Sequence, residues 1–457
     1  MPWRRSVGGT VCPHARDRRI RACPSVHERL AIFTDTIDAA SAERECIEKN
    51  AREGDQLVTG QWRKPKPGMR KDTILGHAGR APERFDGAVN VPVIRASTIL
   101  FADIDSHESA DRFTGVRYGR HGTTTRFALE DTLAQLEGAA RVCALPSGLA
   151  AIVVSLLAFT RTGDHVLLTD SVYGPTRSFC MNRLQLNGVH VEFYDPLIGG
   201  DIARLIRPNT RVVYCESPGS LTFEMQDIPA IAAAAHARNA VVLADNTWAT
   251  PYHFRPFEKG IDVSIHSATK YIVGHADVMM GTIGATETHW RAIRQTAADY
   301  GYAASPDDCY LALRGLRTLA PRLKQQAQSA LTVARWLQQR AEVARVLYPP
   351  LEADPGHGLW KRDMTGAASL FGVELKPAPE AAVKAMANSL HYFGHGASWG
   401  GFESLVTYPK PERIRTAVKW TSGPLLRLHI GLEDPADLIA DLEEGFAELA
   451  KHAARSK

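Results

Sequence analysis

Short, continuous apolar runs alternate with helix-like stretches through the middle of the chain, from about residue 140 to residue 290. The runs are rich in Val, Ile and Leu and are bounded by turn residues, which is the pattern of strands. They are His165–Asp170, Val189–Tyr194, Arg211–Glu216, Ala240–Asp245, Val263–Ser267 and Val278–Ala285. Strands buried on both faces give such runs, and helices such as Asp227–Arg238 lie between them. The pattern therefore predicts an open α/β domain around a mainly parallel sheet.

The pattern changes after Ser305. Two long helical segments come first, and shorter strand-like runs and a final helix follow them. In chain order these segments are Asp307–Leu319, Arg322–Arg340, Ala344–Tyr348, Ser369–Leu375, Leu425–Gly431 and Pro435–Ala450. This grouping predicts a second, smaller C-terminal domain of the α+β class.

The first 68 residues follow neither pattern. Seven arginines meet two acidic residues in the first 29 positions, and one helix-like stretch, Thr36–Arg52, precedes the breaker-rich segment Arg63–Gly68. That segment is typical of a linker. We interpret residues 1–68 as a basic, poorly ordered extension. The alternatives are a transit peptide and an artefactual start upstream of Met69.

The composition is that of an ordinary soluble globular protein, because 44% of the 457 residues are apolar and 23% are charged. The length indicates two or three domains. The 54 Lys and Arg nearly balance the 50 Asp and Glu, and a net charge of +4 gives no electrostatic footprint for nucleic acid. The longest apolar runs, such as Leu149–Ala158, are far shorter than the roughly 20 residues that cross a bilayer. We therefore expect no nucleic-acid partner and no membrane span.

The seven cysteines are scattered without a C-x-x-C pair, so the sequence predicts neither a disulfide scaffold nor a zinc site. A reducing, cytoplasmic setting is the corresponding expectation. His266 and His275 are nine residues apart, which is not the spacing of a zinc pair on a helix. No metal site is expected.

Polar residues end two successive strand-like runs. The run Val241–Asp245 ends in a carboxylate, and the run Val263–Ser267 leads directly to Lys270. In open α/β sheets, ligands bind beyond the carboxyl ends of the strands. The sequence therefore predicts an acid and an amine side by side at such a site.

Lysine is scarce in this region, since Lys259 and Lys270 are the only lysines between Lys71 and Lys324. We expect Lys259 to be solvated, because it lies in a turn-like segment. Lys270 follows a buried type of strand, and a desolvated amine has a lowered pKa and is a nucleophile towards an aldehyde. On position alone, a surface lysine in a strand-to-helix loop is an equally good interpretation of Lys270.

The neighbours of Lys270 favour the chemical interpretation. Pyridoxal phosphate (PLP) needs a lysine for its Schiff base and an acid, here Asp245, that keeps its ring nitrogen protonated. Tyr173 is a candidate to stack on the ring. The cofactor also needs an anion site, for which backbone amides at the start of a helix and hydroxyls beside the lysine are suited. These candidate phosphate ligands are Gly148, Leu149, Ser267 and Thr269.

Six motifs occur in order along the chain: Tyr118–Thr125, Glu216–Ser220, Ala244–Trp248, Ser267–His275, Ser398–Ser404 and Leu426–Glu433. Together they resemble those of the Cys/Met-metabolism enzymes of PLP fold type I, and within that family those of bacterial cystathionine β-lyases. The resemblance runs from about Met69 to Lys457. It implies the PLP-dependent transferase fold of type I. The expected parts are an arm at 69–125 that reaches a neighbouring subunit, a PLP-binding α/β domain with a seven-stranded type of sheet at 126–317, and a C-terminal α+β domain at 318–457.

The resemblance also implies a role for each matching residue. Catalysis would depend on Lys270 as the Schiff-base lysine, Asp245 as the partner of the ring nitrogen, and Tyr173 as the stacking ring. The phosphate would be bound by Gly148, Leu149, Ser267 and Thr269 of one subunit and by Tyr118 and Arg120 of its neighbour. The substrate would meet Ser398, Trp399, Tyr118 and Arg427, whose planar fork suits an α-carboxylate.

The implied activity is the PLP-dependent elimination of homocysteine from L-cystathionine, with pyruvate and ammonia as the other products. This is a transsulfuration step of methionine biosynthesis. Lys270 would remove the Cα proton as a general base and help to protonate the departing sulfur. The implied assembly is a homotetramer of dimers that share their active sites.

The choice of subgroup depends on few positions. Pro175, Trp399 and the pair Gly219-Ser220 favour the β-lyases, whereas related synthases and γ-lyases usually differ there. Cystathionine γ-lyase, cystathionine γ-synthase or methionine γ-lyase activity remains the enzymatic alternative. His121 departs from the lyase pattern, which has a second Arg at this place, so the preference among thioethers stays open. A PLP-binding regulatory protein, with residues 1–68 as its contact segment, is the non-enzymatic alternative.

Overall fold

The computed structural model describes residues 68–455. Apart from Gly68, the expected basic extension lies outside the described residues, and so does its helix-like stretch Thr36–Arg52. The expected borders of the arm and of the two domains remain predictions.

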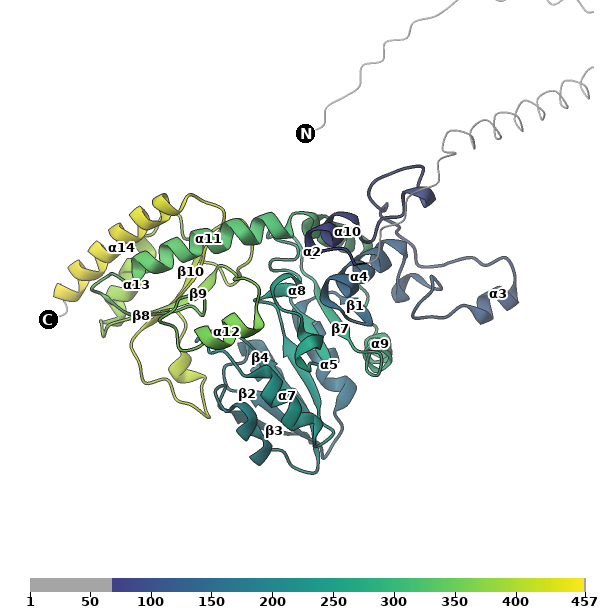
Figure 1. Ribbon diagram of the computed structural model, residues 1–457, viewed down its shortest axis with the longest axis horizontal. Helices are drawn as coiled ribbons and strands as arrows, with labels where there is room; N and C mark the ends of the chain where they lie inside the picture. The colour runs from purple at the N-terminus through teal and green to yellow at the C-terminus, as the bar shows by residue number, and fades with distance from the viewer. Residues whose placement is uncertain (1–67, 456–457) are drawn as a thin grey trace, which may run out of the picture. The chain divides into compact units, whose positions relative to one another are not determined.

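A seven-stranded sheet forms the centre of the first part of the described chain (Figure 1). Its strands are β1 (Arg141–Leu145), β2 (His165–Thr169), β3 (His190–Tyr194), β4 (Thr210–Glu216), β5 (Val241–Asp245), β6 (Val263–His266) and β7 (Gly281–Ala285). They lie in the order β1-β7-β6-β5-β4-β2-β3, and within this sheet β7 alone runs antiparallel to its neighbours. The predicted α/β class and mainly parallel sheet are confirmed.

Strand β7, the last strand of the first sheet along the chain, is shorter than the apolar run that predicted it. We expected Val278–Ala285, but β7 begins at Gly281. The backbone of Met280 bonds to Thr269 instead, since its oxygen accepts from the Thr269 amide at 3.1 Å and its amide donates to the Thr269 hydroxyl at 2.8 Å. The residues before β7 thereby hold the turn that contains Lys270.

Helices connect and cover these strands. They are α4 (Thr124–Glu137), α5 (Gly148–Phe159), α6 (Gly174–Phe179), α7 (Ile228–His236), α8 (Thr250–His253), α9 (Trp290–Asp299) and α10 (Pro306–Arg317). Shorter turns are η3 (Gly119–His121), η4 (Cys180–Leu184), η5 (Gly199–Arg204) and η6 (Pro256–Lys259). Helix α5 begins after Ser147, whose hydroxyl accepts the Ala150 amide hydrogen at 3.1 Å as an N-cap.

A second sheet of four antiparallel strands follows (Figure 1, green to yellow). Its strands are β8 (Val343–Leu347), β9 (Leu370–Leu375), β10 (Leu405–Thr407) and β11 (Leu425–His429), in the order β10-β11-β9-β8. Its helices are α11 (Leu319–Leu337), α12 (His357–Asp363), α13 (Glu380–Ser389) and α14 (Pro435–Arg455), with the short turn η7 (Pro411–Arg413). The expected C-terminal α+β part is confirmed, whereas α12, α13 and β10 were not predicted.

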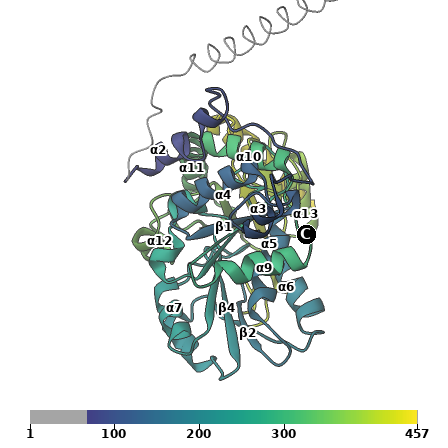
Figure 2. The same ribbon diagram turned by 90° about the vertical axis from the view of Figure 1, so that its right-hand side faces the viewer.

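Successive strand residues of the first sheet point to opposite faces and pack in two apolar clusters. In β5, Val242 and Ala244 belong to one cluster and Leu243 to the other. Helices lie on both sides of the strands, with α7 and α12 on the left of Figure 2 and α5, α6 and α9 on the right. Burial on both faces explains why these strands read as continuous apolar runs.

The segment before α4 contains α2 (Lys71–His77), η2 (Pro82–Arg84) and α3 (Ile104–Ser109). The Arg317 guanidinium fixes the end of α2 by donating to the carbonyls of Leu75 and Ala78. Further along, α3 lies on a long excursion away from the first sheet (Figure 1). Leu100 is 90% exposed and Ile104 is 74% exposed in this excursion, so it presents an apolar surface that the described chain leaves uncovered.

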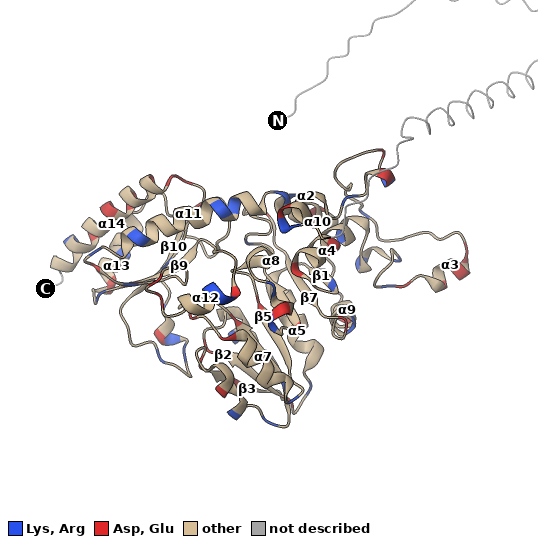
Figure 3. Cartoon of the chain, in the orientation of Figure 1, with Lys and Arg blue, Asp and Glu red and all other residues tan. Residues whose placement is uncertain are grey.

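Lys and Arg are interspersed with Asp and Glu along the helices (Figure 3). Positive and negative charges therefore nearly balance within each part of the described chain, as they do over the whole sequence. None of the helices in the described part of the chain has both the length and the apolar character needed to cross a membrane.

Candidate active site

A cavity of about 550 Å³ lies beyond the carboxyl ends of β4, β5 and β6. Segments that are far apart in the sequence form its walls: the start of α5, the turn before α6, the loop after β4, the turns after β5 and β6, and residues 397–399. Open α/β sheets bind their ligands at this edge. The cavity contains most of the residues that the sequence singled out.

Lys270 lines this cavity, and its Nζ atom donates to the Ser398 hydroxyl at 2.6 Å. Burial, followed by the nearby Arg427 guanidinium, lowers the pKa of Lys270 to about 8, while Asp245 acts in the opposite direction. Gly400 has a φ of +85° and packs against this lysine, since a Cβ added there would lie 2.9 Å from the Lys270 Cβ atom. The amine is therefore desolvated and fixed in place, as an activated nucleophile must be.

Asp245 ends β5 and lies beside Glu216 of β4 in the parallel register. Its Oδ1 atom accepts hydrogen bonds from the Thr247 amide at 3.0 Å and from the Thr247 hydroxyl at 2.5 Å. Burial raises the pKa of Asp245, although the two bonds from Thr247 oppose that shift. A desolvated carboxylate of this kind gains stability when a cation binds beside it.

The start of α5 has free backbone amides, which are the groups that an anion site needs. The amides of Gly148 and Leu149 belong to the first turn, which has no intrahelical acceptors for them. A Cβ added at Gly148 would lie 2.6 Å from the Ser267 Cβ atom, so glycine lets the helix approach the turn after β6. The Thr269 hydroxyl is less free than expected, because it already donates to the Met280 oxygen at 3.2 Å.

Tyr173 precedes α6, and its side chain, 40% exposed, lines the cavity. Its backbone amide donates to Glu216 Oε2 at 2.7 Å. Burial and then the charges of Asp245 and Glu216 raise the pKa of the Tyr173 phenol, with Arg427 opposing them. The ring therefore lies close to the carboxylate at the end of β5, and its phenol stays protonated at neutral pH.

Arg427 lies in the middle of β11, between Thr407 of β10 and Gly372 of β9. Burial lowers the pKa of its guanidinium, and Tyr173 opposes this shift. No acidic side chain within residues 68–455 contributes to that balance. A half-buried cation without an anionic partner is suited to bind a carboxylate of a ligand through two parallel hydrogen bonds.

Ser398 and Trp399 line the cavity on the side of the second sheet. The Trp399 ring centre lies 5.4 Å from Lys270 Nζ and 5.4 Å from the ring centre of Tyr271. These contacts confine the lysine between a hydroxyl and an aromatic face, so its amine has few alternative positions.

Tyr118 and Arg120 are not brought to this cavity within one chain. The Arg120 guanidinium donates to the Ala298 carbonyl at 3.1 Å, and its Cζ atom lies 5.9 Å from the Tyr118 ring centre. Tyr118 is 44% exposed. Their predicted role at the phosphate of a neighbour remains a prediction.

Sequence reasoning missed Glu216 and Thr247, which hold the Tyr173 amide and the Asp245 carboxylate. Glu216 ends a strand, so the strand-end signal that identified Asp245 could have found it. The expectation for Lys259 was wrong, because its Nζ atom pairs with Asp363 at 3.0 Å and its side chain is only 26% exposed.

The two histidines set aside from metal binding make local contacts. His266 bonds to Glu137 at 2.6 Å, and His275 bonds to the Val273 carbonyl at 2.6 Å. Within residues 68–455, no group of three or more His, Cys, Asp or Glu side chains is arranged to hold a metal ion.

These residues fit PLP by their chemistry. The desolvated amine of Lys270 faces the cavity, and the nearby carboxylate of Asp245 would be stabilised by a bound cation. Helix α5, which begins at Gly148, offers free backbone amides in the same cavity. Lys270 would bind the aldehyde carbon, Asp245 the ring nitrogen, and Gly148 and Leu149 the phosphate.

Comparison with known proteins gives an independent result. A family model described as Cys/Met metabolism PLP-dependent enzyme matches residues 72–447. The chain is 44% identical to the cystathionine β-lyase MetC of Escherichia coli, over 83% of this chain and 98% of that protein. It is 43% identical to the cystathionine β-lyase of Salmonella typhimurium, again over 83% and 98% of the two chains.

Two further comparisons show a wider range of activities. The chain is 37% identical to the L-alanine/L-glutamate racemase of Wolbachia pipientis, over 83% of this chain and 98% of that protein. The solved structure of a cystathionine γ-synthase from Xanthomonas oryzae, in complex with aminoacrylate and cysteine, matches with a TM-score of 0.77 and 30% identity. That match covers 85% of this chain and 100% of the other.

Proposed function

The chain belongs to the Cys/Met-metabolism family of PLP-dependent enzymes, and from this premise we propose that it cleaves the Cβ–S bond of L-cystathionine. With water, the products are homocysteine, pyruvate and ammonia. The observation that carries the proposal is the cavity in which Lys270, Asp245 and Tyr173 face one another close to an unpaired Arg427. Relatives that match this chain over almost their whole length are named cystathionine β-lyases.

Bound PLP supplies an electron sink that stabilises negative charge on the substrate Cα atom. The residues of the chain do the remaining work. Arg427 binds the α-carboxylate and so fixes which Cα bond lies near Lys270. The pKa of Lys270, lowered to about 8 by burial and by Arg427, lets its amine accept a proton from Cα near neutral pH and donate one to the departing sulfur.

Asp245 and Tyr173 act on the ring. Because burial raises the pKa of the Asp245 carboxyl, this group binds most strongly to a ring nitrogen that carries a proton and a positive charge. Tyr173 covers one face of the part of the cavity that the ring would occupy, and it keeps water from that face. Trp399 and Ser398 line the same cavity, so the reacting atoms are held in a largely apolar enclosure.

The assembly we propose is a homo-oligomer, most simply a homotetramer of dimers, in which Tyr118 and Arg120 of one subunit reach the phosphate in the next. The support is that both residues lie outside the cavity of their own chain, on a segment whose Leu100 and Ile104 are exposed. A cytoplasmic location is part of the same proposal. It is supported by the four free cysteines of the described part, Cys143, Cys180, Cys215 and Cys309.

Two other reactions use the same residues. γ-Elimination is favoured by the structural match to a cystathionine γ-synthase, and racemisation by the match to an amino-acid racemase. Both would begin with the same proton transfer at Cα by Lys270. γ-Elimination would then need a second proton removed from Cβ before the Cγ–S bond breaks, whereas racemisation would need only the return of a proton to the opposite face of Cα.

Product analysis separates these possibilities. The holoenzyme is incubated with L-cystathionine, and pyruvate, 2-oxobutyrate, homocysteine and cysteine are quantified; L-alanine is incubated separately and its D-isomer is measured. We expect pyruvate and homocysteine in equal amounts and well above the other products. An excess of 2-oxobutyrate with cysteine would assign γ-elimination, D-alanine as the main product would assign racemisation, and no turnover would favour a regulatory protein.

A further inference from the structure

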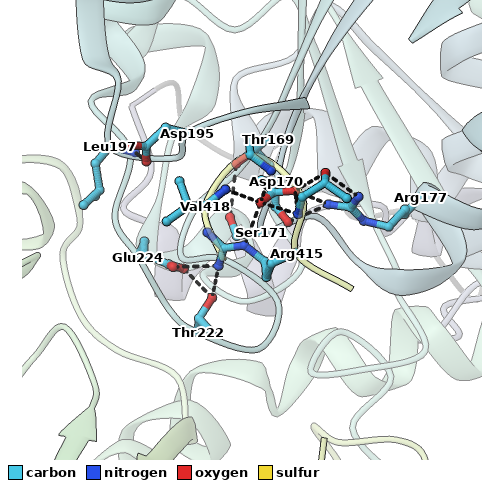
Figure 4. Close-up of polar contacts among 12 residues, drawn as sticks. Thr169, Asp170, Ser171, Arg177, Asp195, Leu197, Thr222, Glu224, Arg415 and Val418 are labelled. Atoms are coloured by element: carbon cyan, nitrogen blue, oxygen red, sulfur yellow. Dashed lines mark hydrogen bonds and ion pairs between the residues drawn. The ribbon is translucent and has the colours of Figure 1, made fainter. Parts of the chain in front are cut away.

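Asp170 and Arg415 lie in a cluster of polar contacts (Figure 4), and neither lines the cavity. We propose that these two residues, together with Arg177 and Glu224, form a buried clamp that positions the cavity loops for the substrate. We call this group the Asp170 clamp. Its role in turnover rests on the proposed function, whereas its effect on the loops can be measured without any turnover.

Asp170 follows β2 directly, and its side chain is fully buried. Two arginines and one short stretch of backbone surround the carboxylate: Arg415 Nε donates at 3.1 Å, the amides of Ala417 and Val418 at 2.9 Å each, and Thr416 through its amide and its hydroxyl at 3.0 Å. Although burial favours the neutral form, the amides of Val418 and Thr416, followed by Arg177 and Arg415, bring the pKa of Asp170 down to about 2. The carboxylate is thus charged at neutral pH and all its acceptor positions are used.

Arg415 extends the clamp to the loop after β4. Its side chain is 5% exposed, and while Nε binds Asp170, Nη1 donates to both Thr222 Oγ1 and Glu224 Oε1 at 2.8 Å. Thr222 in turn donates to Glu224 at 2.5 Å. One planar guanidinium therefore joins the segment after β2, the loop after β4 and the loop before β11 (Figure 4).

The loops held in this way carry lining residues of the cavity. The Ser220 amide donates to the Ser171 carbonyl at 2.9 Å, and the Gly219 amide donates to the Glu224 carbonyl at 3.0 Å. A Cβ added at Gly219 would lie 2.5 Å from the Ser171 Cβ atom, so the two loops are in direct contact. Gly219, Ser220 and Tyr173 all line the cavity, and Tyr173 lies three residues after Asp170.

The clamp also connects the two sheets across the cavity. Residues 415–418 precede β11, the strand that carries Arg427, whereas Tyr173 belongs to the loop after β2. Arg427 and Tyr173 influence each other electrostatically. Because Asp170 binds the first segment and lies within the second, the clamp sets the spacing between the stacking ring and the group that binds the substrate carboxylate.

A charged clamp is better suited to this task than apolar packing. Buried ion pairs contribute little net stability, since desolvation offsets most of their attraction. They do fix geometry, because removing one hydrogen bond leaves a charged partner unsatisfied. We therefore assign Asp170 and Arg415 as positioning residues, which act on substrate through Tyr173, Ser220 and Arg427.

The decisive variant is Arg415→Lys, because a single ammonium keeps the positive charge but cannot bridge Asp170 and Glu224 as a fork does. We expect kcat to fall about tenfold, KM for the sulfur amino acid to rise several-fold, and the visible absorbance of bound PLP to persist. In the same holoenzyme, amides of residues 171–176 and 219–223 should exchange hydrogen about tenfold faster, while those of α5 and β5 keep their rates. Thr222→Val removes the hydrogen bonds of Thr222 to Arg415 and Glu224 but leaves those two residues paired with each other, and a smaller change in the same direction is expected.

Arg362→Lys is the matched control. Arg362 also joins two acids, Asp363 and Asp227, by bonds of 2.7 and 2.9 Å, but none of the three lines the cavity. It should keep wild-type kcat, KM and exchange rates. Unchanged kinetics and exchange in both Arg415→Lys and Thr222→Val would overturn the proposal, as would faster exchange spread evenly over the chain. An inactive wild type would instead refute the proposed function, and the exchange data would still decide on the clamp.

Discussion

The Nζ atom of Lys270 lies 2.6 Å from the hydroxyl oxygen of Ser398, a residue 128 positions later in the chain. Through this hydrogen bond, a residue of the C-terminal part fixes the position of the Lys270 amine, which follows the first sheet. Ser398→Ala removes the acceptor and leaves the lysine free to move. A hydrogen bond to a charged group is worth about 1.5–3 kcal/mol, so we expect kcat to fall roughly tenfold or more in steady-state assays, with the PLP absorbance retained. An unchanged kcat would show that the bond has no part in turnover.

The two lysines of the sheet region should behave differently when removed. Lys270→Ala should abolish turnover and covalent attachment of PLP in a protein that still folds. Lys259→Ala should keep both, with a loss of about 0.5–1 kcal/mol in the free energy of unfolding, because its ion pair with Asp363 is partly exposed. Absorbance spectra and denaturant titrations of both variants check this. Attachment lost in Lys259→Ala and kept in Lys270→Ala would reverse the assignment.

Recovery of the holoenzyme from apoenzyme should depend on pH through Lys270. Attack on the aldehyde needs the neutral amine, and burial and Arg427 lower the pKa of Lys270 to about 8. Below that value the neutral fraction, and so the rate of reconstitution, should rise about tenfold per pH unit, and above it the rate should level off. Stopped-flow absorbance after mixing with PLP measures the profile. A rate that still climbs tenfold per unit between pH 9 and pH 10 would mean an unshifted lysine.

Acid should weaken the fold through Asp170. The pKa of Asp170 is about 2 in the fold, against about 3.9 for an unfolded aspartate. Since the folded value is depressed, this group stabilises the fold fully above pH 5 and loses that contribution as the pH falls from about 4 to 2. The loss amounts to about 2–3 kcal/mol. Urea titrations at pH 5 and pH 2.5 should show a steeper loss in the wild type than in Asp170→Asn, and parallel losses would contradict the shift.

Shared sites predict complementation between inactive variants. Lys270→Ala and Arg120→Ala homo-oligomers should both be poor enzymes, the first without its reactive amine and the second without a charge-assisted phosphate contact. If Arg120 acts in the neighbouring subunit, a mixed dimer has one site with both defects and one with neither. Co-refolded protein should then regain activity. If Arg120 serves its own chain, activity stays at the average of the two parents.

Much of the first sheet could be predicted because burial on both faces makes a strand visible as an apolar run. β10 has only three residues and leaves no comparable signal. Helix α13 does leave one that we missed, since Ala382, Val383, Met386 and Ala387 recur at helical spacing and are buried. Asp245 and Lys270 could be placed in the candidate site from the sequence, because each lies at or just after the end of an apolar strand, where open α/β sheets bind ligands. Thr247 could not, because its role depends on the direction of a hydroxyl and not on its residue type.

The Asp170 clamp shows a second limit of sequence reasoning. Asp170 and Arg415 are separated by 245 positions. Asp170 ends an apolar run, as Asp245 does, but nothing in the sequence pairs it with Arg415. Lys259 illustrates the same problem, since the sequence does not show that Asp363 folds against it. Partners that meet only through tertiary structure have no local pattern.

The larger apolar cluster contains side chains of both sheets, including Val242 of β5 and Val373 of β9. A single apolar interior therefore continues from one sheet to the other. Melting of the described chain should follow as one cooperative event, since exposing either sheet uncovers the interior of the other. A partly unfolded chain could not keep half of the site intact. Heat should therefore destroy the candidate PLP pocket and strand β11, which carries Arg427, in the same step.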